Sequence, residues 1–294
     1  MLYEIIFLQL FFALGIPLNK ALLGYCSFLT LTVIRLFVAS FALLLCHFYF
    51  SQDKPFYNGQ PLLLGKKIIF GSFLKYILKY WGFQFVSTVH MAFLLHTTPL
   101  WTGLLDYLCY NTKLTPYNIV GMLIGFIGSI PLVLNTYDSL SFSLFSLPAC
   151  AIMIAVASHS YGVLCTKELV TIHNYSPFAV AGIGSFGAGL LALLFAVTTN
   201  HTFYVNEPKN FSVLFFGLIL INNIIGKSWH TKLLRHYNAT FLACSDYLYP
   251  IIVSIASYIT TGEAPNKQHM IAFIATIIGL WLFRITPQKN NSYK

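Results

Sequence analysis

Charged residues are scarce in this sequence, and acidic residues are the scarcest. Only 9% of the 294 residues are Asp, Glu, Lys or Arg, and 8 of these are acidic against 17 basic. Hydrophobic residues make up 57% of the chain and aromatic residues 17%. This composition has too little polar surface to cover a soluble globule of this length. It therefore predicts a protein that lies in a lipid bilayer.

The short motifs of the main hydrolytic enzymes are also missing. The sequence contains no glycine-rich phosphate loop before Lys-Ser/Thr, no His-Glu-x-x-His and no Gly-x-Ser-x-Gly. ATP-driven pumping and intramembrane hydrolysis need such residues. We therefore predict a protein that is not an enzyme, with no catalytic residues and no cofactor.

Metal sites and nucleic-acid binding are not indicated either. The formal net charge is +9, but the basic residues are scattered beside apolar runs and form no patch, so we predict no nucleic-acid partner. Met1 leads through Glu4 into an apolar run without a basic leader or a cleavage site, so we expect the first span to be retained. The cysteines lack metal-ligand spacing and are expected to be small core residues: Cys26, Cys46, Cys109, Cys150, Cys165 and Cys244.

An internal repeat organises the chain. Val86 to Val133 aligns with Tyr237 to Arg284 at an offset of 151 residues, which places Pro99 on Pro250 and Gly128 on Gly279. A repeat of this size in so hydrophobic a chain predicts a membrane protein built from two homologous halves. Many secondary transporters have this organisation.

Apolar runs long enough to cross a bilayer, about 17 to 25 residues, number ten. Five spans per half is an odd number, so the halves would enter the membrane from opposite faces as an inverted repeat. We expect repeats at 1–135 and 147–285, an outer connecting loop at 136–146 and a cytoplasmic tail at 286–294. The predicted spans are Leu2 to Leu18, Ser27 to Phe50, Ile68 to Phe85, Thr88 to Tyr110, Tyr117 to Leu134, Leu147 to Leu164, Pro177 to Thr198, Phe211 to Trp229, Ala239 to Thr260 and His269 to Ile285.

The distribution of basic residues supports an even number of spans with both termini in the cytoplasm. Removing one span from each half would preserve this parity, and the third stretch, with Lys75 and Lys79, has an alternative as a basic aromatic helix on the inner surface. The expected outer cations are Lys20, Lys209 and Lys267, against inner cations at Lys54, Lys66, Lys67, Lys113, Lys167, Lys232, Arg235, Arg284, Lys289 and Lys294.

The two halves resemble the modules of the drug/metabolite transporter superfamily, in particular its ten-span EamA-type members. The resemblance covers nearly the whole chain and is carried by Ser27 to Leu36 with its Arg35, the Pro99-Leu100 and Pro250-Ile251 pairs, and the Gly262-Glu263 turn. It implies an all-α membrane protein of ten transmembrane helices that moves a small organic metabolite by alternating access. Two departures argue against a strictly symmetrical mechanism. Thr112 stands at the place of Glu263, and Phe186 stands opposite Arg35.

Ionisable residues inside predicted spans indicate the site. A Lys, Arg or Asp at a helix centre costs about 2.5–3.5 kcal/mol, so such residues face a wet cavity or a partner. Lys75 and Lys79, four residues apart, share a helix face, and the repeat offset places Lys227 opposite Tyr76. These cations and Arg35 predict a cavity that attracts a carboxylate or phosphate. The alternatives are snorkelling to the inner surface and structural pairing with an acid such as Asp246, Glu4 or Asp106.

Asp246 is the acid that we expect in the site, because Pro250 breaks the helix close to it near mid-membrane. Tyr247 and Tyr249 offer ring faces for an ammonium or sulfonium group, or act as interface anchors. His90, His96 and His159 are candidates for proton coupling or for structural hydrogen bonds. The predicted substrate-binding residues are Arg35, Lys75, Lys79, Trp81, His90, Asn223, Lys227, Asp246, Tyr247 and Tyr249.

The stretch from Tyr247 to Lys267 is similar to S-adenosylmethionine carriers of intracellular bacteria within this superfamily. The resemblance implies S-adenosylmethionine as substrate, with S-adenosylhomocysteine as exchange partner, in a bacterial inner membrane. An amino acid or a nucleotide-linked sugar would use many of the same groups. A channel and a structural membrane protein are the alternatives from other classes, although repeated proline breaks favour alternating access over a fixed pore.

Overall fold

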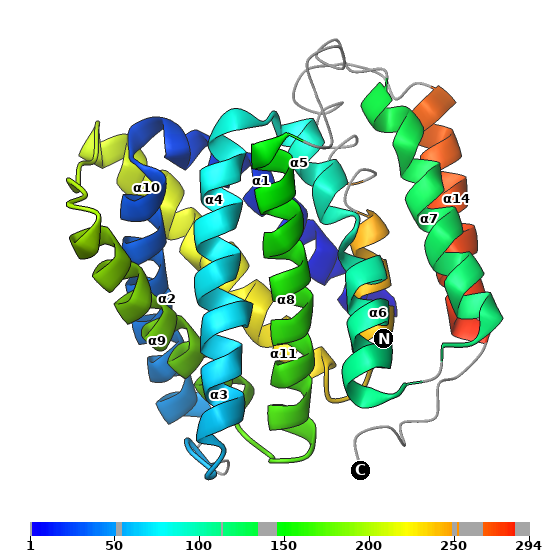
Figure 1. The fold of residues 1–294 in the computed structure, drawn as a ribbon, viewed down its shortest axis with the longest axis horizontal. Helices are drawn as coiled ribbons and strands as arrows, with labels where there is room; N and C mark the ends of the chain where they lie inside the picture. The colour runs from blue at the N-terminus through cyan, green and yellow to red at the C-terminus, as the bar shows by residue number, and fades with distance from the viewer. Residues whose placement is uncertain are drawn as a thin grey trace.

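The computed structural model describes residues 2–50, 55–112, 114–134, 146–248, 252 and 267–285. Within these ranges the chain is helical and has no strands, apart from an isolated bridge between Cys26 and Val205. The predicted all-α class is therefore confirmed (Figure 1). The Gly262-Glu263 turn, the 136–145 part of the connecting loop and the 286–294 tail lie outside the described residues.

The helices of the first half follow the predicted spans in order, and the first span extends to Tyr25, beyond the predicted Leu18. The third predicted span starts earlier than expected, at Pro61, because α3, η1 and α4 run on as one helix. The fourth is divided at His96 and Thr97. The elements are α1 (Leu2–Tyr25), α2 (Phe28–Phe50), α3 (Pro61–Ile68), the π-helix η1 (Ile69–Leu74), α4 (Lys75–Phe85), α5 (Thr88–Leu95), α6 (Thr98–Tyr110) and α7 (Pro116–Leu134).

The second half repeats this order. Its third helix also contains a π-helical segment, and its fourth is broken by a 3₁₀ turn. The elements are α8 (Leu147–Thr171), α9 (Pro177–Thr198), α10 (Pro208–Leu218), the π-helix η3 (Ile219–Gly226), α11 (Lys227–Leu233), α12 (Ala239–Cys244), the 3₁₀ turn η4 (Ser245–Leu248) and α14 (Lys267–Ile285).

Five helical runs are long and apolar enough to cross a bilayer by length and composition. The other predicted spans do not meet both the length and the composition condition within the described residues, so the number ten stays a prediction. The five runs are Glu4–Tyr25, Phe28–Phe50, Leu147–Thr171, Pro177–Thr198 and Pro208–Leu233.

Irregular helix occurs at equivalent places in the two halves. Shifting η1 by the repeat offset of 151 residues places it inside η3, and shifting the break at His96 and Thr97 places it on η4. Single π turns in membrane helices are tolerated where neighbouring helices or a cavity satisfy the disturbed backbone. The repeated irregularities therefore indicate a functional region shared by both halves.

Helices of one half pack against helices of the other, and the pattern of contacts stays the same when the two halves are exchanged. α2 packs against α9, α7 against α14 and α6 against α12, while the contacts of α3 and η1 with α8 have their equivalents in those of α10 and η3 with α1. In Figure 1 α7 and α14 stand side by side at the right of the molecule. His96 and Tyr247, which are equivalent in the repeat, have ring centroids 5.9 Å apart. Equivalent residues in contact lie close to the axis that relates the halves.

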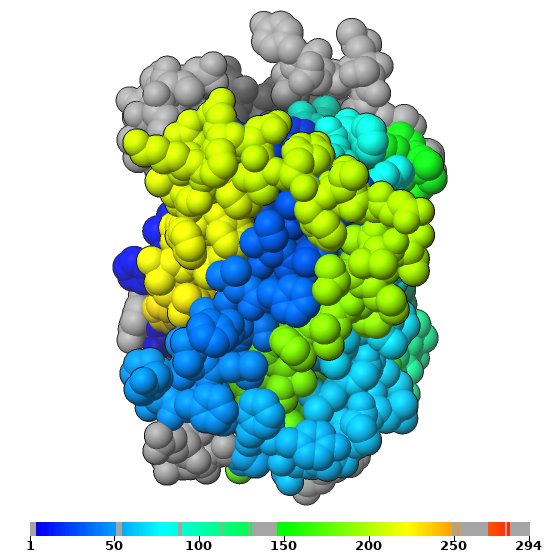
Figure 2. Space-filling model, turned by 90° about the vertical axis from the view of Figure 1, so that its left-hand side faces the viewer, coloured from blue at the N-terminus to red at the C-terminus, as the bar shows by residue number. Residues whose placement is uncertain are grey.

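The outer surface carries large apolar side chains. Figure 2 looks onto the face where α2 lies against α9 and η3. Phe41 of α2, Leu194 of α9, and Val213 and Phe216 of α10 are each at least 61% exposed. Soluble monomers do not expose apolar surface on this scale, whereas a lipid-facing surface does. The described chain is therefore an integral membrane protein whose polar residues gather inside.

The third helix of the first half belongs to the bundle. η1 and α4 pack against α8, and Tyr76, Tyr80 and Phe83 of α4 are buried. The alternative of a basic helix along the inner surface is therefore wrong for this stretch. Lys67, expected among the inner cations, is also buried, because α3 continues directly into this helix.

Candidate functional site: a charged cavity between the halves

A cavity lies between the two halves and is lined by both. It contains about 1240 Å³ of space not filled by atoms, including its mouth. Its walls come from α1, α2, the α3–η1–α4 helix, α8, α9, η3, α11 and η4, with contributions from the ends of α5 and α6. The two π-helical segments border it directly.

The cavity brings together ionisable residues that are far apart in the sequence. Arg35, Lys75, Lys79, Lys227 and Asp246 all line it. Lys75 and Lys79 come from α4, and Lys227 opens α11 on the other half. The arrangement concentrates positive charge in one space, with a single acid among the lining residues that the structure describes.

Arg35 is held by hydrogen bonds to uncharged groups. Its Nε and Nη2 donate to the Asn223 side-chain oxygen at 3.1 and 2.8 Å, and its Nη1 donates to the Asn19 side-chain oxygen at 2.6 Å and to the Tyr80 hydroxyl. Its guanidinium carbon also lies 5.3 Å from the centre of the Tyr76 ring. The side chain is only 4% exposed. Arg35 therefore ties α1, α2, α4 and η3 together while bordering the cavity.

The lysines of the cavity have fewer partners. Lys227 donates one hydrogen bond, of 2.7 Å, to the Ser185 hydroxyl. The Lys75 ammonium lies 5.2 Å from the centre of the Tyr76 ring. In the described part of the chain no carboxylate lies within ion-pair distance of these lysines or of Lys79. Their ammonium groups therefore retain donors for a bound ligand.

Asp246 stands where the ninth predicted span loses its regular helix. α12 ends at Cys244, and Asp246 is the second residue of the 3₁₀ turn η4. The Gln9 amide donates to one of its carboxylate oxygens at 3.1 Å and also to the Ser245 hydroxyl. The predicted coincidence of a helix break and an acid is therefore present, although Pro250 itself lies outside the described residues.

Four predicted site residues do not line the cavity, and a fifth, Tyr249, lies outside the described part of the chain. Trp81 packs against Phe85, with ring centroids 5.4 Å apart. The His90 ring nitrogen Nδ1 and the Ser87 hydroxyl are joined by a hydrogen bond of 2.7 Å at the start of α5. Asn223 supports Arg35, and the Tyr247 hydroxyl donates to the Met122 carbonyl at 2.9 Å. None of the four is among the described cavity-lining residues.

Several lining residues were not among the predicted site residues. Lys67 is the most consequential, and Asn19, Asn222 and His230 also line the cavity. His230 follows Lys227 at a helical spacing of three, which was a usable signal. Lys67 looked like a flanking cation because the third span was expected to start at Ile68. The described residues contain no group of three His, Cys, Asp or Glu side chains placed to hold a metal ion.

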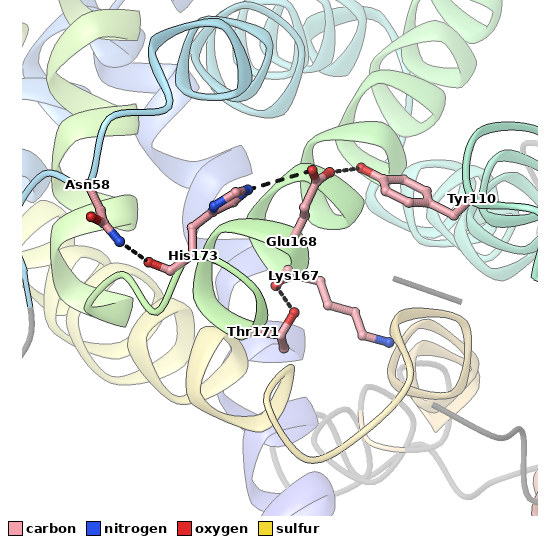
Figure 3. A network of polar contacts seen from close by, with 6 residues as sticks. All are labelled: Asn58, Tyr110, Lys167, Glu168, Thr171 and His173. Atoms are coloured by element: carbon pink, nitrogen blue, oxygen red, sulfur yellow. Dashed lines mark hydrogen bonds and ion pairs between the residues drawn. The ribbon is translucent and has the colours of Figure 1, made fainter. Parts of the chain in front are cut away.

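A polar network joins elements at the end of the bundle where α6 and α8 terminate (Figure 3). The Tyr110 hydroxyl donates to a Glu168 carboxylate oxygen at 2.7 Å, and the other oxygen lies 4.0 Å from His173 Nε2. The Asn58 amide donates to the His173 carbonyl at 2.8 Å. Nearby, Lys167 donates to the Asn238 side-chain oxygen at 3.2 Å. These contacts tie both halves together on one side of the cavity.

Comparison with known proteins identifies the family. The pattern of the EamA-like transporter family matches residues 3–134 and 146–285. The chain belongs to this family. The match covers each half separately, in agreement with the internal repeat and with the pairing of helices across the halves. This EamA-family chain is a transporter and not an enzyme.

Named relatives and a solved structure agree with this assignment. The chain is 24% identical over 270 residues to S-adenosylmethionine/S-adenosylhomocysteine transporters of Chlamydia trachomatis serovars L2 and D, covering 88% of this chain and 82% of each relative. The transporter of the same name from Chlamydia muridarum is 23% identical, with 88% and 84% covered. A structure described only as "Crystal structure of protein" matches with a TM-score of 0.75 at 15% identity, over 96% of this chain and 94% of the other. That last similarity concerns the fold.

Proposed function

We propose that this EamA-family protein is a secondary carrier that exchanges S-adenosylmethionine for S-adenosylhomocysteine by alternating access. The observation that carries the proposal is the charged cavity between the two halves, in a chain whose relatives are named for this pair of metabolites. We further propose ten spans with both termini in the cytoplasm of a bacterium, and repeats at 1–135 and 147–285.

The chemistry of the cavity suits the parts of S-adenosylmethionine. Its carboxylate would pair with cavity lysines such as Lys75 and Lys79. Its ammonium and sulfonium groups would face Asp246 and the ring of Tyr76. Its adenine would stack on an aromatic face, which Phe12 and Tyr76 supply among the lining residues. A binding mode of this kind uses residues from both halves, so the solute would bridge them.

Alternating access has structural support at the helix breaks. The paired π-helical segments and the paired breaks at His96–Thr97 and η4 lie in equivalent parts of the halves. Such discontinuities let one half rock against the other around a fixed central site. The Tyr110–Glu168–His173 network would then hold one entrance closed.

Counterflow in proteoliposomes tests the carrier and its substrate together. Vesicles loaded with unlabelled S-adenosylhomocysteine should accumulate labelled S-adenosylmethionine faster than vesicles loaded with buffer. A channel shows no such trans-acceleration. Uptake that is independent of the internal solute would contradict exchange, and failure of this pair while another solute is exchanged would contradict the substrate.

The charge of the cavity favours a second candidate from the same superfamily. The lining carries Arg35 and four lysines against Asp246, an excess of positive charge that suits a net anionic solute. A nucleotide-linked sugar, or an acidic amino acid, fits that excess better than a cationic sulfonium does. Including both in the counterflow panel separates these substrates from S-adenosylmethionine.

A further inference from the structure

Lys67 is a buried cation that borders the cavity and has no polar partner among the residues that the structure describes. Its side chain is 6% exposed, and it lies near the end of α3, one turn before the cavity-lining Gly71. Within the described residues it has no hydrogen bond and no ion pair. Burying an ammonium group without a counter-charge is costly unless a ligand or water satisfies it.

Two glycines provide the path for this side chain. A Cβ atom added to Gly71 would lie 2.9 Å from the Lys67 Nζ and 2.8 Å from the Gly162 Cα. A Cβ added to Gly162 would lie 2.0 Å from the Gly71 Cα. Any side chain at either position would collide with the facing helix or with Lys67. The close approach of η1 and α8 therefore depends on these glycines and lets Lys67 reach the cavity wall.

The π-helical segment brings Lys67 into line with Lys75. In a regular α-helix, eight residues make a little over two turns, and the two side chains would diverge by about 80°. The wider turns of η1 take up more residues per turn and reduce that divergence. Lys227 enters from the other half, and the positive charges of these three lysines repel one another. Lys67, Lys75 and Lys227 thus line one cavity, and within the described residues none of them forms an ion pair.

Arg35 does not share this role. Its guanidinium already donates to Asn19, Asn223 and Tyr80. Lys67 and Lys75 donate no hydrogen bond within the described residues, and Lys227 donates a single one, to Ser185. Among the described residues, these lysines therefore retain more unused donors than Arg35 does.

We propose that Lys67, Lys75 and Lys227 form a binding site for the anionic group of the transported solute, a carboxylate or a phosphate, and that Lys67 determines the preference for anions. The inference rests on the proposed function only in that the solute binds in this cavity. It does not depend on the solute being S-adenosylmethionine.

Thermal unfolding of the purified protein with simple anions tests the site. Inorganic phosphate and acetate, each compared with sodium chloride at equal ionic strength, should raise the unfolding temperature of the wild-type protein in a saturable way. Lys67→Met should weaken the apparent affinity for the effective anion by about tenfold or more, the factor expected for losing a charge-assisted hydrogen bond. A stronger effect of phosphate than of acetate identifies a phosphate site, and the reverse order identifies a carboxylate site.

Matched variants make the test specific. Lys66→Met removes the same charge from the exposed neighbouring residue and should leave the anion effect unchanged. Lys67→Arg keeps the charge and should retain most of the effect. Lys227→Met changes a lysine of the site that comes from the other half, and it should weaken anion affinity as Lys67→Met does. This second variant keeps the test decisive if Lys67→Met does not fold.

Two results would overturn the inference. One is a wild-type protein that neither phosphate nor acetate stabilises beyond chloride. The other is an unchanged anion effect in both Lys67→Met and Lys227→Met. Counterflow separates this failure from failure of the proposed function. If anions stabilise the protein but S-adenosylmethionine is not exchanged, the proposed substrate is wrong and the anion site stands. If S-adenosylmethionine is exchanged but anions do not stabilise the protein, the proposed substrate stands and the anion site is wrong.

Discussion

Arg35 and the cavity lysines carry the same charge in different surroundings. Arg35 is enclosed by Asn19, Tyr80 and Asn223, which belong to three different helical elements. The lysines border open space. A planar guanidinium with five donors suits such an enclosed junction, while a flexible ammonium suits contact with a ligand. At the scale of the residue, the cations of one cavity thus divide into an arginine enclosed by hydrogen bonds and lysines that border open space.

Replacing Arg35 should therefore destabilise the protein more than it alters selectivity. Arg35→Met removes the two N–H groups that donate to the Asn223 side-chain oxygen, at a cost of about 1–3 kcal/mol for a buried group left unsatisfied, while the Tyr80 hydroxyl still donates to Asn19. We expect a lower unfolding temperature and a lower monodisperse yield. Lys209→Ala, which removes an exposed cation, should change neither. A stable Arg35→Met protein with impaired transport would instead assign Arg35 to substrate binding.

Asp246→Asn tests the acid of the cavity. If Asp246 faces the cationic end of the solute, the variant should keep its folded yield and raise the half-saturation concentration for a cationic or zwitterionic solute more than for an anionic analogue, by about tenfold. If the carboxylate is structural, the yield should fall, because buried cations lose a counter-charge. Measuring monodisperse yield beside transport separates the two roles. Normal yield with unchanged transport of every solute would remove Asp246 from the site.

At the scale of the element, helix irregularity follows the repeat. η1 and η3 occupy equivalent positions, as do the break between α5 and α6 and the turn η4. Apolar periodicity predicted continuous spans here, since it registers which residues are buried and not how many residues make a turn. The prolines at Pro99 and Pro250 did signal a break. The π-helical segments had no comparable signal in the sequence, and η1 lies where Gly71 meets Gly162 of a distant helix.

The network at the ends of α6 and α8 should limit access to the cavity from that side. Glu168→Gln keeps the size of the side chain but removes the charge that faces Tyr110 and His173. Partly exposed polar contacts of this kind contribute about 0.2–1 kcal/mol, so opening should become up to about fivefold more frequent. The labelling rate of a cysteine placed at the cavity residue Thr166 measures this.

Thr171→Ala provides the control for that experiment. The Thr171 hydroxyl donates to the Lys167 carbonyl within the same helix and joins no second element. Its removal should leave the labelling rate unchanged. Equal rates in wild type, Glu168→Gln and Thr171→Ala would show that the network does not gate the cavity.

At the scale of the whole molecule, the two halves depend on each other. Nearly every long helix packs against its equivalent or against a helix of the other half, and the cavity draws its charges from both. A half on its own would leave an apolar face and several ionisable residues exposed to lipid. The protein is therefore expected to fold and to bind its solute only as a complete chain.

The proposed topology can be tested at two exposed lysines. Lys66 is predicted to lie inside and Lys209 outside, and both side chains are exposed. Cysteines at these positions, in a protein whose exposed Cys109 is replaced, should react with a membrane-impermeant reagent from opposite sides of the membrane. Labelling of both from one side would contradict the predicted number of spans or their orientation.

The sequence by itself determined the class of protein and its organisation in two halves. Scarce charge and long apolar runs require a bilayer, and an offset of 151 residues between Pro99 and Pro250 reveals the repeat. The sequence also predicted that Lys75, Lys79, Lys227 and Asp246 face a cavity, because ionisable residues within apolar spans are costly and must face a cavity or a partner.

Only the tertiary structure decided which polar residues face the cavity. In the folded chain Arg35 is enclosed by hydrogen bonds, Tyr247 packs against Gly125, and Lys67 lies at the cavity wall. These outcomes depend on how helices distant in sequence approach each other. A periodic pattern assigns a residue to a face of one regular helix, whereas a π turn or a glycine contact changes the direction and the neighbour of that face.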